Sequence, residues 1–195
     1  MREFDIEKAK KKLKKELSPF RYAHTLGCAD TCRAMAERFG IDPEKAYITG
    51  LLHDNAKDMK FADQVAYAES KGVQLSRTAL ESPHITHAPV GAIRARYEFG
   101  MDDEEILSAI DCHTTGKTHM STLDKILFVA DLIEPNRDHS YTDGLREMAK
   151  GSLNETVLAC MDRVIGFVLE KRELLCFETV EARNYLLREE IGDFN

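Results

Sequence analysis

The residues of this sequence that are most able to do chemistry are histidines and aspartates beside apolar segments. His53 and Asp54 stand together after the apolar residues 49–52. Asp131 lies within Ile-Leu-Phe-Val-Ala-Asp-Leu-Ile, and a helix that is apolar on nearly every side is usually buried. An ionised carboxylate is costly there unless it pairs with a cation or binds a metal. Taken singly, a salt bridge for Asp131 and a hydrogen-bonded core histidine for His53 explain these signals as well.

Histidines on other segments favour a metal site. His24 lies on an apolar segment, His84 and His87 precede Pro89, and His113 stands near the end of a further apolar segment. Helix bundles build metal sites from inward side chains on facing helices. Imidazole and carboxylate together suit iron, manganese, zinc or cobalt, and the sequence does not rank these metals.

Basic residues accompany the candidate ligands. Arg21 is three residues before His24, Lys57 follows Asp54 by three residues, and Arg137 follows Asp131 by six. Lys117 and His119 follow His113 in the same way. Each basic residue alone reads as an exposed solubilising charge, but the set predicts an anionic substrate, and phosphate is the natural choice because cations and metal ions share its oxygens.

The segments that carry these residues are predicted to be helices. Ser18-Pro19 and Asp42-Pro43 are helix start signals, because a capping side chain precedes a proline in the first turn. Strand alternation and hairpin signals are nearly absent, so we expect one all-α domain. The expected helices cover residues 6–17, 19–39, 43–56, 61–71, 89–99, 102–113, 121–134, 142–150, 152–174 and 180–191.

Composition narrows the classes of function. The chain has 195 residues, is 43% hydrophobic and carries a net charge of -7. This balance argues against a nucleic-acid polymer or an anionic membrane as partner, because both require a basic surface. The sequence has no apolar run of about 18 residues that could span a bilayer and no signal peptide. Its five scattered cysteines do not form a disulfide framework, so we expect a cytoplasmic protein.

The order of these motifs resembles that of the HD-domain superfamily of metal-dependent phosphohydrolases. The likeness is greatest to its YqeK-type branch of bacterial symmetrical diadenosine tetraphosphate hydrolases, and it covers roughly residues 18–190. An isolated His-Asp pair is weak evidence, whereas several strings in the same order are strong evidence. The strings are Arg-Tyr-Ala-His-Thr-Leu-Gly at 21–27, Leu-Leu-His-Asp-Asn-Ala-Lys at 51–57, His-Ala-Pro-Val-Gly-Ala at 87–92, Ala-Ile-Asp-Cys-His-Thr-Thr-Gly at 109–116 and Ala-Asp-Leu-Ile-Glu-Pro-Asn-Arg at 130–137.

The resemblance implies a single HD domain over residues 1–195, a helical bundle with a core at about 18–140 and C-terminal helices at 142–191 packing on it. It implies two divalent or mixed-valence ions, with iron the usual metal. One ion would be bound by His24, His53, Asp54 and Asp131, and Asp54 would bridge to a second ion bound by His87 and His113. His84 has no place in this ligand set. Catalytic roles fall on Asp54, Lys57 and His87, and substrate contacts on Arg21, Lys57, Thr114 and Arg137.

The activity that the resemblance implies is cleavage of diadenosine tetraphosphate into two ADP by a hydroxide that bridges the ions. Alternatives remain open: a phosphohydrolase of a mononucleotide, deoxynucleotide or alarmone, or a nucleotide-binding module without turnover. Adenine and guanine are not distinguished. A zinc site that includes Cys28 or Cys112 is the alternative for the metal. The last helix either closes the core or contacts a second copy in a homodimer.

Overall fold

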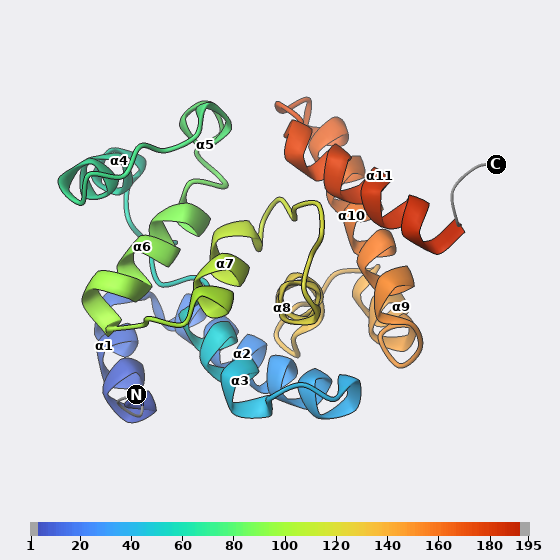
Figure 1. Cartoon of the computed structure of the whole chain (residues 1–195), viewed down its shortest axis with the longest axis horizontal. Coiled ribbons are helices and arrows are strands. Elements are labelled where there is room, and N and C mark those ends of the chain that lie inside the picture. The colour runs from blue at the N-terminus through green and yellow to red at the C-terminus, as the bar shows by residue number, and fades with distance from the viewer. Residues whose placement is uncertain (1–3, 192–195) are drawn as a thin grey trace.

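The computed structural model describes residues 4–191, and these residues form eleven helices and no strand (Figure 1). The prediction of an all-α fold is confirmed. In the described part of the chain, none of the helices combines the length and apolarity needed to cross a membrane. The helices are α1 (Ile6–Glu16), α2 (Pro19–Phe39), α3 (Pro43–Leu52), α4 (Phe61–Ser70), α5 (Arg77–Glu81), α6 (His87–Phe99), α7 (Glu104–Cys112), α8 (Thr122–Ile133), α9 (Thr142–Met148), α10 (Leu153–Lys171) and α11 (Phe177–Ile191).

Side-chain caps start the helices that lead to the site. Ser18 accepts a hydrogen bond from the backbone N–H of Arg21 at the start of α2, and Asp42 caps α3 in the same way. Ser121 and Asp124 form a reciprocal capping box at the start of α8. These caps satisfy N–H groups that have no partner within the helix.

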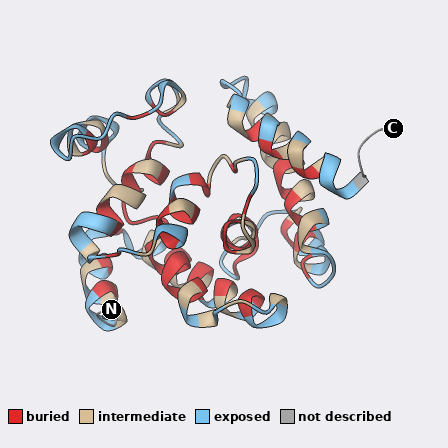
Figure 2. Ribbon diagram, in the orientation of Figure 1, coloured by how far each residue is buried: buried red, intermediate tan, exposed pale blue. Residues whose placement is uncertain are grey.

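The main core lies around α8. This helix buries seven apolar side chains and packs against α2, α3, α7 and α10. Figure 2 shows buried residues concentrated on α8 and on the sides of α2 and α3 that face it. Because α8 is enclosed by other helices, it holds Asp131 at a fixed position among them. The buried apolar residues of α8 are Leu123, Ile126, Leu127, Phe128, Val129, Ala130 and Ile133.

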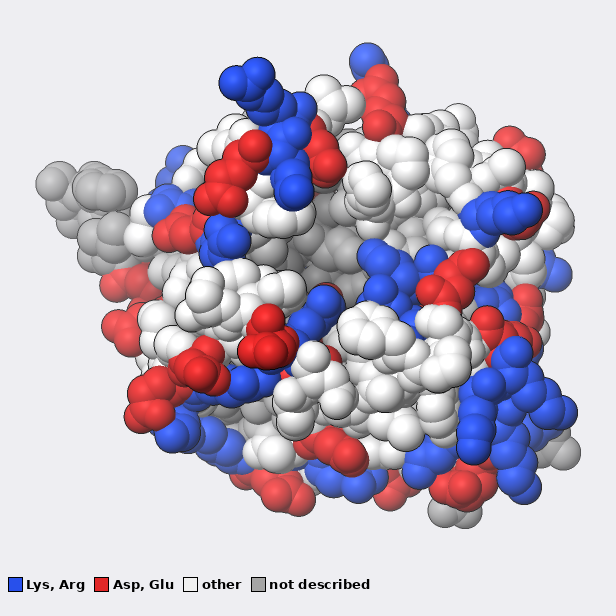
Figure 3. Space-filling view, turned by 180° about the vertical axis from the view of Figure 1, so that it is seen from behind, with Lys and Arg blue, Asp and Glu red and all other residues white. Residues whose placement is uncertain are grey.

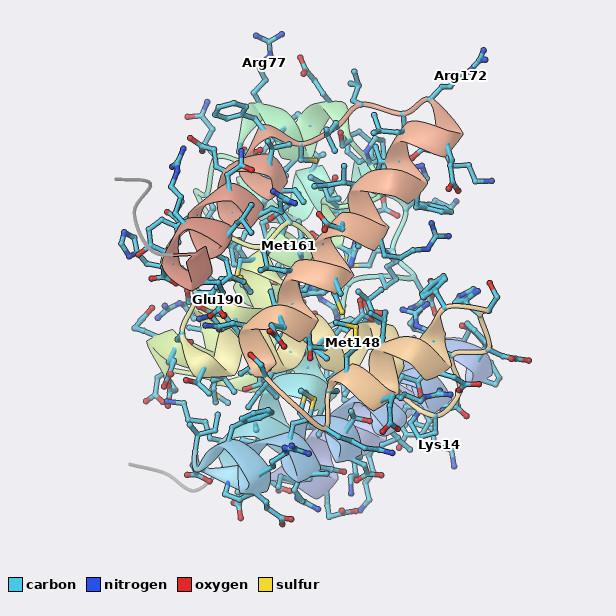
Figure 4. All side chains as sticks on the ribbon, turned by 90° about the vertical axis from the view of Figure 1, so that its right-hand side faces the viewer. Lys14, Arg77, Met148, Met161, Arg172 and Glu190 are labelled. Carbon is cyan, nitrogen blue, oxygen red and sulfur yellow. The ribbon has the colours of Figure 1, made fainter. Side chains whose placement is uncertain are left out.

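A second, smaller core lies under α4, α5 and the outer side of α6. It consists of Ala56, Ala68, Leu75, Ala79 and Val90. In Figure 1, α4 and α5 stand on one side of the molecule and α10 and α11 on the other. Figure 4 shows α10 and α11 side by side on their face of the molecule.

Two helix starts differ from the expected ones. The helix predicted from Pro89 begins at His87, because the first N–H groups of a helix need no intrahelical partner and a proline fits within that first turn. The helix expected from residue 102 begins at Glu104, and Asp103 caps it by accepting from the N–H groups of Glu105 and Ile106.

Helix lengths differ as well. The helix expected to reach residue 56 ends at Leu52, and a series of turns follows. The short helix α5 was not predicted, since its five residues carry too little periodicity. The segment expected as helix to residue 174 ends at Lys171, and α11 begins earlier than predicted, at Phe177.

Candidate metal centre

The predicted ligands come from five helices and one turn and converge in one place. His24 lies within α2, His53 is the C-cap of α3, and Asp54 follows it on the turn. His87 begins α6 and His113 is the C-cap of α7. Asp131 lies within α8. All of these side chains are buried except that of Asp131, which is 19% exposed.

The imidazole rings are oriented by hydrogen bonds on their outer side. The Nδ1 atoms of His53 and His113 each lie 2.7 Å from a backbone carbonyl oxygen, of Gly50 and Ile110 respectively. A carbonyl only accepts, so Nδ1 of each ring is a donor and Nε2 is the nitrogen directed at the site. In His24, Nδ1 lies 3.0 Å from Glu134 Oε1, which orients this ring in the same way.

The Nε2 atoms then face one another in pairs. His24 Nε2 lies 3.3 Å from His53 Nε2, and His87 Nε2 lies 3.2 Å from His113 Nε2. Burial lowers the pKa of His87 to about 4 despite the neighbouring Asp54, so this ring is neutral near pH 7. Nε2 is a common metal-ligating atom of histidine, and each pair brings two such atoms together.

Asp54 lies between the two histidine pairs. Its Oδ2 is 3.5 Å from His24 Nε2 and 3.4 Å from His53 Nε2. Its Oδ1 is 3.2 Å from His87 Nε2 and 3.7 Å from His113 Nε2. Burial acts to raise the pKa of Asp54, but His53 and hydrogen bonds from His113 and His87 hold it well below its usual range. The carboxylate is therefore ionised and offers one oxygen to each pair.

Asp131 completes the donor set from the side of α8. Its Oδ1 lies 3.0 Å from His24 Nε2 and 3.8 Å from His53 Nε2. Burial is outweighed by His24, Arg137 and His53, so the pKa of Asp131 lies well below its usual range. Donor atoms of His24, His53 and Asp131, and of His53, Asp54 and His113, lie within 4.8 Å of one another. Imidazole nitrogens together with ionised carboxylates at this spacing fit divalent metal ions.

Hydrogen bonds from outside the donor set fix the turn that carries Asp54. Asn55 Nδ2 donates to the carbonyls of Leu52, at 2.7 Å, and Gly91, at 2.8 Å. The guanidinium of Arg94 donates to the carbonyl of Asn55. These bonds tie the turn to α6 and explain why the chain leaves the helix after Leu52.

Three of the predicted cations contact the donor set. Arg21 Nη1 lies 2.7 Å from Asp54 Oδ2, and Arg137 Nη2 lies 2.7 Å from Asp131 Oδ1. Lys57 Nζ lies 3.2 Å from ring nitrogens of His87, and burial lowers the pKa of Lys57 although Asp54 and Asp131 oppose this. The rear face is hollowed near its centre, and Lys and Arg side chains lie along the edge of the hollow (Figure 3).

Other candidates lie elsewhere. His84 is exposed and lies 3.9 Å from Glu173. Lys117 pairs with Asp124 at 2.8 Å rather than turning to the ligands. Burial raises the pKa of Cys28 well above its usual value, so it is a neutral thiol, a poor metal ligand. Thr114 follows His113 and lines a cavity whose lining includes none of the predicted metal ligands, and its buried Oγ1 is unpaired within the protein.

One functional carboxylate was missed from the sequence. Glu134 is 1% exposed and orients His24 through Nδ1, while its Oε2 accepts from the backbone N–H of Asn136 at 2.8 Å. Gly27 leaves the space for it, because a Cβ there would lie 2.2 Å from Glu134 Oε2. The available signal was an acid three residues after Asp131, on the same apolar segment.

Comparisons with known proteins agree with this geometry. The family model described as HD domain matches residues 21–136. A symmetrical bis(5'-nucleosyl)-tetraphosphatase from Bacillus subtilis is 34% identical over 90% of this chain and 94% of its own length. The one from Halalkalibacterium halodurans is 36% identical over 94% and 97%, and the one from Staphylococcus aureus is 36% identical over 93% and 94%.

A solved structure has the same fold. The crystal structure of a predicted HD superfamily hydrolase involved in NAD metabolism, from Clostridium acetobutylicum, superposes with a TM-score of 0.92. It is 38% identical, over 95% of this chain and 98% of that one. The chain therefore belongs to the HD domain family, whose histidines and aspartates bind divalent metal ions.

Proposed function

We propose that this protein hydrolyses dinucleoside tetraphosphates symmetrically, so that diadenosine tetraphosphate yields two ADP. The observation that carries the proposal is the convergence of the Nε2 atoms of four imidazoles on the two oxygens of Asp54. Three relatives that match over nearly the whole chain are named symmetrical bis(5'-nucleosyl)-tetraphosphatases, which supports this substrate and this position of cleavage.

The donor set is suited to two ions. We assign His24, His53, Asp54 and Asp131 to the first and Asp54, His87 and His113 to the second. Bound divalent ions lower the pKa of a coordinated water and polarise phosphoryl oxygens. We propose iron for both ions, with manganese, cobalt and zinc as the alternatives; metal quantification after anaerobic purification distinguishes them.

The chain's own cations bind the phosphates. Arg21 uses one nitrogen on Asp54, while its Nε has no protein partner and is available to an anion. Arg137 at Asp131 and Lys57 at His87 place further positive charge at the same site. Guanidinium groups match phosphate oxygens in pairs, and Lys57 stabilises charge that develops on the leaving diphosphate. We assign Thr114, which directly follows His113, as a further substrate contact through its hydroxyl.

The test is product analysis. Incubation with diadenosine tetraphosphate in ¹⁸O-labelled water should give ADP as the nucleotide product, with label in the β-phosphate of one ADP of each pair. AMP together with ATP would contradict symmetrical cleavage. A panel with a mononucleotide, a deoxynucleotide and an alarmone tests the alternative substrates, and faster release of phosphate from any of them would replace our assignment.

The alternative of a binding module without turnover has its own test. Asp54→Ala should abolish hydrolysis while circular dichroism shows that the helices remain. If Asp54→Ala released ADP as fast as the unaltered protein, the measured hydrolysis would come from a contaminating enzyme and not from this site. For the location, we infer the cytoplasm, because the substrate is a nucleotide and all five cysteines are free thiols.

A further inference from the structure

A cavity separate from the donor cluster lies between α5, α6 and α11. Its volume is about 530 Å³, within the range of small-molecule sites. Leu75 and Ala79 line one wall, and Pro89 and Ile93 of α6 line another.

The cavity wall begins close to the metal centre. Thr114 directly follows His113, and Pro89 is two residues after His87. Consecutive Cα atoms are about 3.8 Å apart, so a ligand with phosphates at the donor cluster can reach the cavity with its remaining part.

The charge of the cavity is opposite to that of the phosphate site. Asp111, Glu178 and Glu181 line it. Its lysine, Lys117, is engaged by Asp124 at 2.8 Å. Carboxylates repel phosphate, so the cavity excludes the charged part of the substrate while Arg21, Lys57 and Arg137 attract it.

The cavity also holds acceptors that lack protein donors. Glu178 Oε1 accepts from the Thr78 hydroxyl at 2.8 Å, whereas its Oε2 is buried without a partner. The buried Thr114 Oγ1 is likewise without a partner. A buried polar atom without a partner is costly, and a ligand with N–H or O–H donors satisfies it.

We propose that this cavity receives one nucleoside of the substrate: the apolar walls contact the flat base, and Glu178 and Thr114 bond its amino group or the ribose hydroxyls. The proposal rests on the proposed function, since it names where the uncharged part of that substrate binds. The metal ions and the three cations bind the phosphates, and the cavity distinguishes a nucleotide from inorganic phosphate compounds.

Equilibrium binding to the metal-loaded protein tests this, with ADP and inorganic diphosphate as the two probes. The unaltered protein should bind ADP more tightly. Ala92→Phe fills the cavity from α6, and Glu178→Gln replaces an acceptor by a donor while keeping an oxygen for Thr78. Each should weaken ADP binding by about tenfold and leave diphosphate binding within about twofold. Glu189→Gln is the matched control, because Glu189 is exposed on the same helix and lies outside this cavity.

Equal loss of affinity for ADP and diphosphate, or unchanged ADP affinity in Ala92→Phe, would overturn the proposal. Thermal unfolding of each variant identifies a folding defect, and Glu178→Gln serves as the second probe if Ala92→Phe is unstable. Because binding is measured without turnover, this result is independent of the product analysis. A failure of symmetrical cleavage would leave it standing, and a failure here would leave the reaction assignment intact.

Discussion

The two halves of the proposed metal centre are held by different means. In the α2–α8 half, His24 and Asp131 lie within long helices of the main core, and Glu134 orients His24. In the α6–α7 half, His87 and His113 lie at helix ends. Both halves share Asp54. The first half has a second carboxylate, Asp131, and two cations, Arg21 and Arg137, that pair with these acids at 2.7 Å. The second half has no further carboxylate and faces Lys57 at 3.2 Å. Because it has the additional carboxylate and lies on long helices, we expect tighter metal binding in the α2–α8 half.

The change with the largest expected effect removes what the halves share. Asp54→Asn should lose both ions and lower the rate of ADP release by about a thousandfold or more, because both histidine pairs depend on its charge. Elemental analysis and an activity assay measure this. Asp58→Asn is the matched control: Asp58 lies on the same turn and accepts from Ser18, outside the donor set. Metal retained in Asp54→Asn would show that the halves are independent.

The second prediction separates the halves. Titration of the unaltered protein with a chelator should remove metal in two phases, and the weaker ion should belong to the α6–α7 half. His87→Ala should abolish the weaker phase alone. Asp131→Ala should lose the tighter ion and activity with it. A single phase, or loss of the tighter phase in His87→Ala, would reverse the comparison.

The third prediction concerns the support of His24. Glu134→Ala should weaken the tighter ion by about 10- to 100-fold, as measured by chelator competition, and Glu134→Gln should weaken it less because an acceptor for Nδ1–H remains. Gly27→Ala should act in the same direction, since its Cβ displaces Glu134. Gly166→Ala on α10 is the control, because a Cβ there meets nothing within 4 Å. Unchanged metal affinity in both Glu134 variants would show that this carboxylate does not support metal binding through His24.

The smallest effect concerns stability of the α6 side. Burial acts to raise the pKa of Glu98, but Arg94 and Lys12 lower it to about 2. A depressed carboxyl pKa adds stability above the unfolded value, near 4.5, and that stability is lost as pH falls toward about 2. Glu98→Gln should therefore unfold about 1–2 kcal/mol more easily at pH 7, and the difference should shrink below about pH 4.5. Urea unfolding across this range measures it; a constant difference would argue against the ion pair.

The sequence was informative where a reactive side chain interrupts a regular apolar pattern or a capping side chain precedes a helix. Asp131 stood out because an acid on an apolar helix needs a partner, and the caps at Ser18 and Asp42 follow from local rules. The all-α fold was predictable as well, because helix start signals recur along the chain and strand signals are nearly absent. The ligand set itself came from the resemblance, since spacing alone does not show which faces of distant helices meet.

The remaining features depend on tertiary contacts. The end of α3 at Leu52 is set by Asn55, Gly91 and Arg94, far apart in sequence. At the cavity, the hydroxyl of Thr78 on α5 donates a hydrogen bond to Glu178 on α11, and the two residues are 100 positions apart in the sequence. No local pattern encodes such pairings, and the motif around His113 did not predict that Thr114 lines a cavity.

Gly27 has a consequence for engineering. Replacing helical glycines by alanine is a common way to raise thermostability, with a gain of about 0.5–1 kcal/mol for each compatible site. At position 27 an added methyl group would collide with Glu134 Oε2. A screen that measures melting temperature alone would not detect the loss of the Glu134 contact that orients His24. Position 27 should therefore be left out of such a screen.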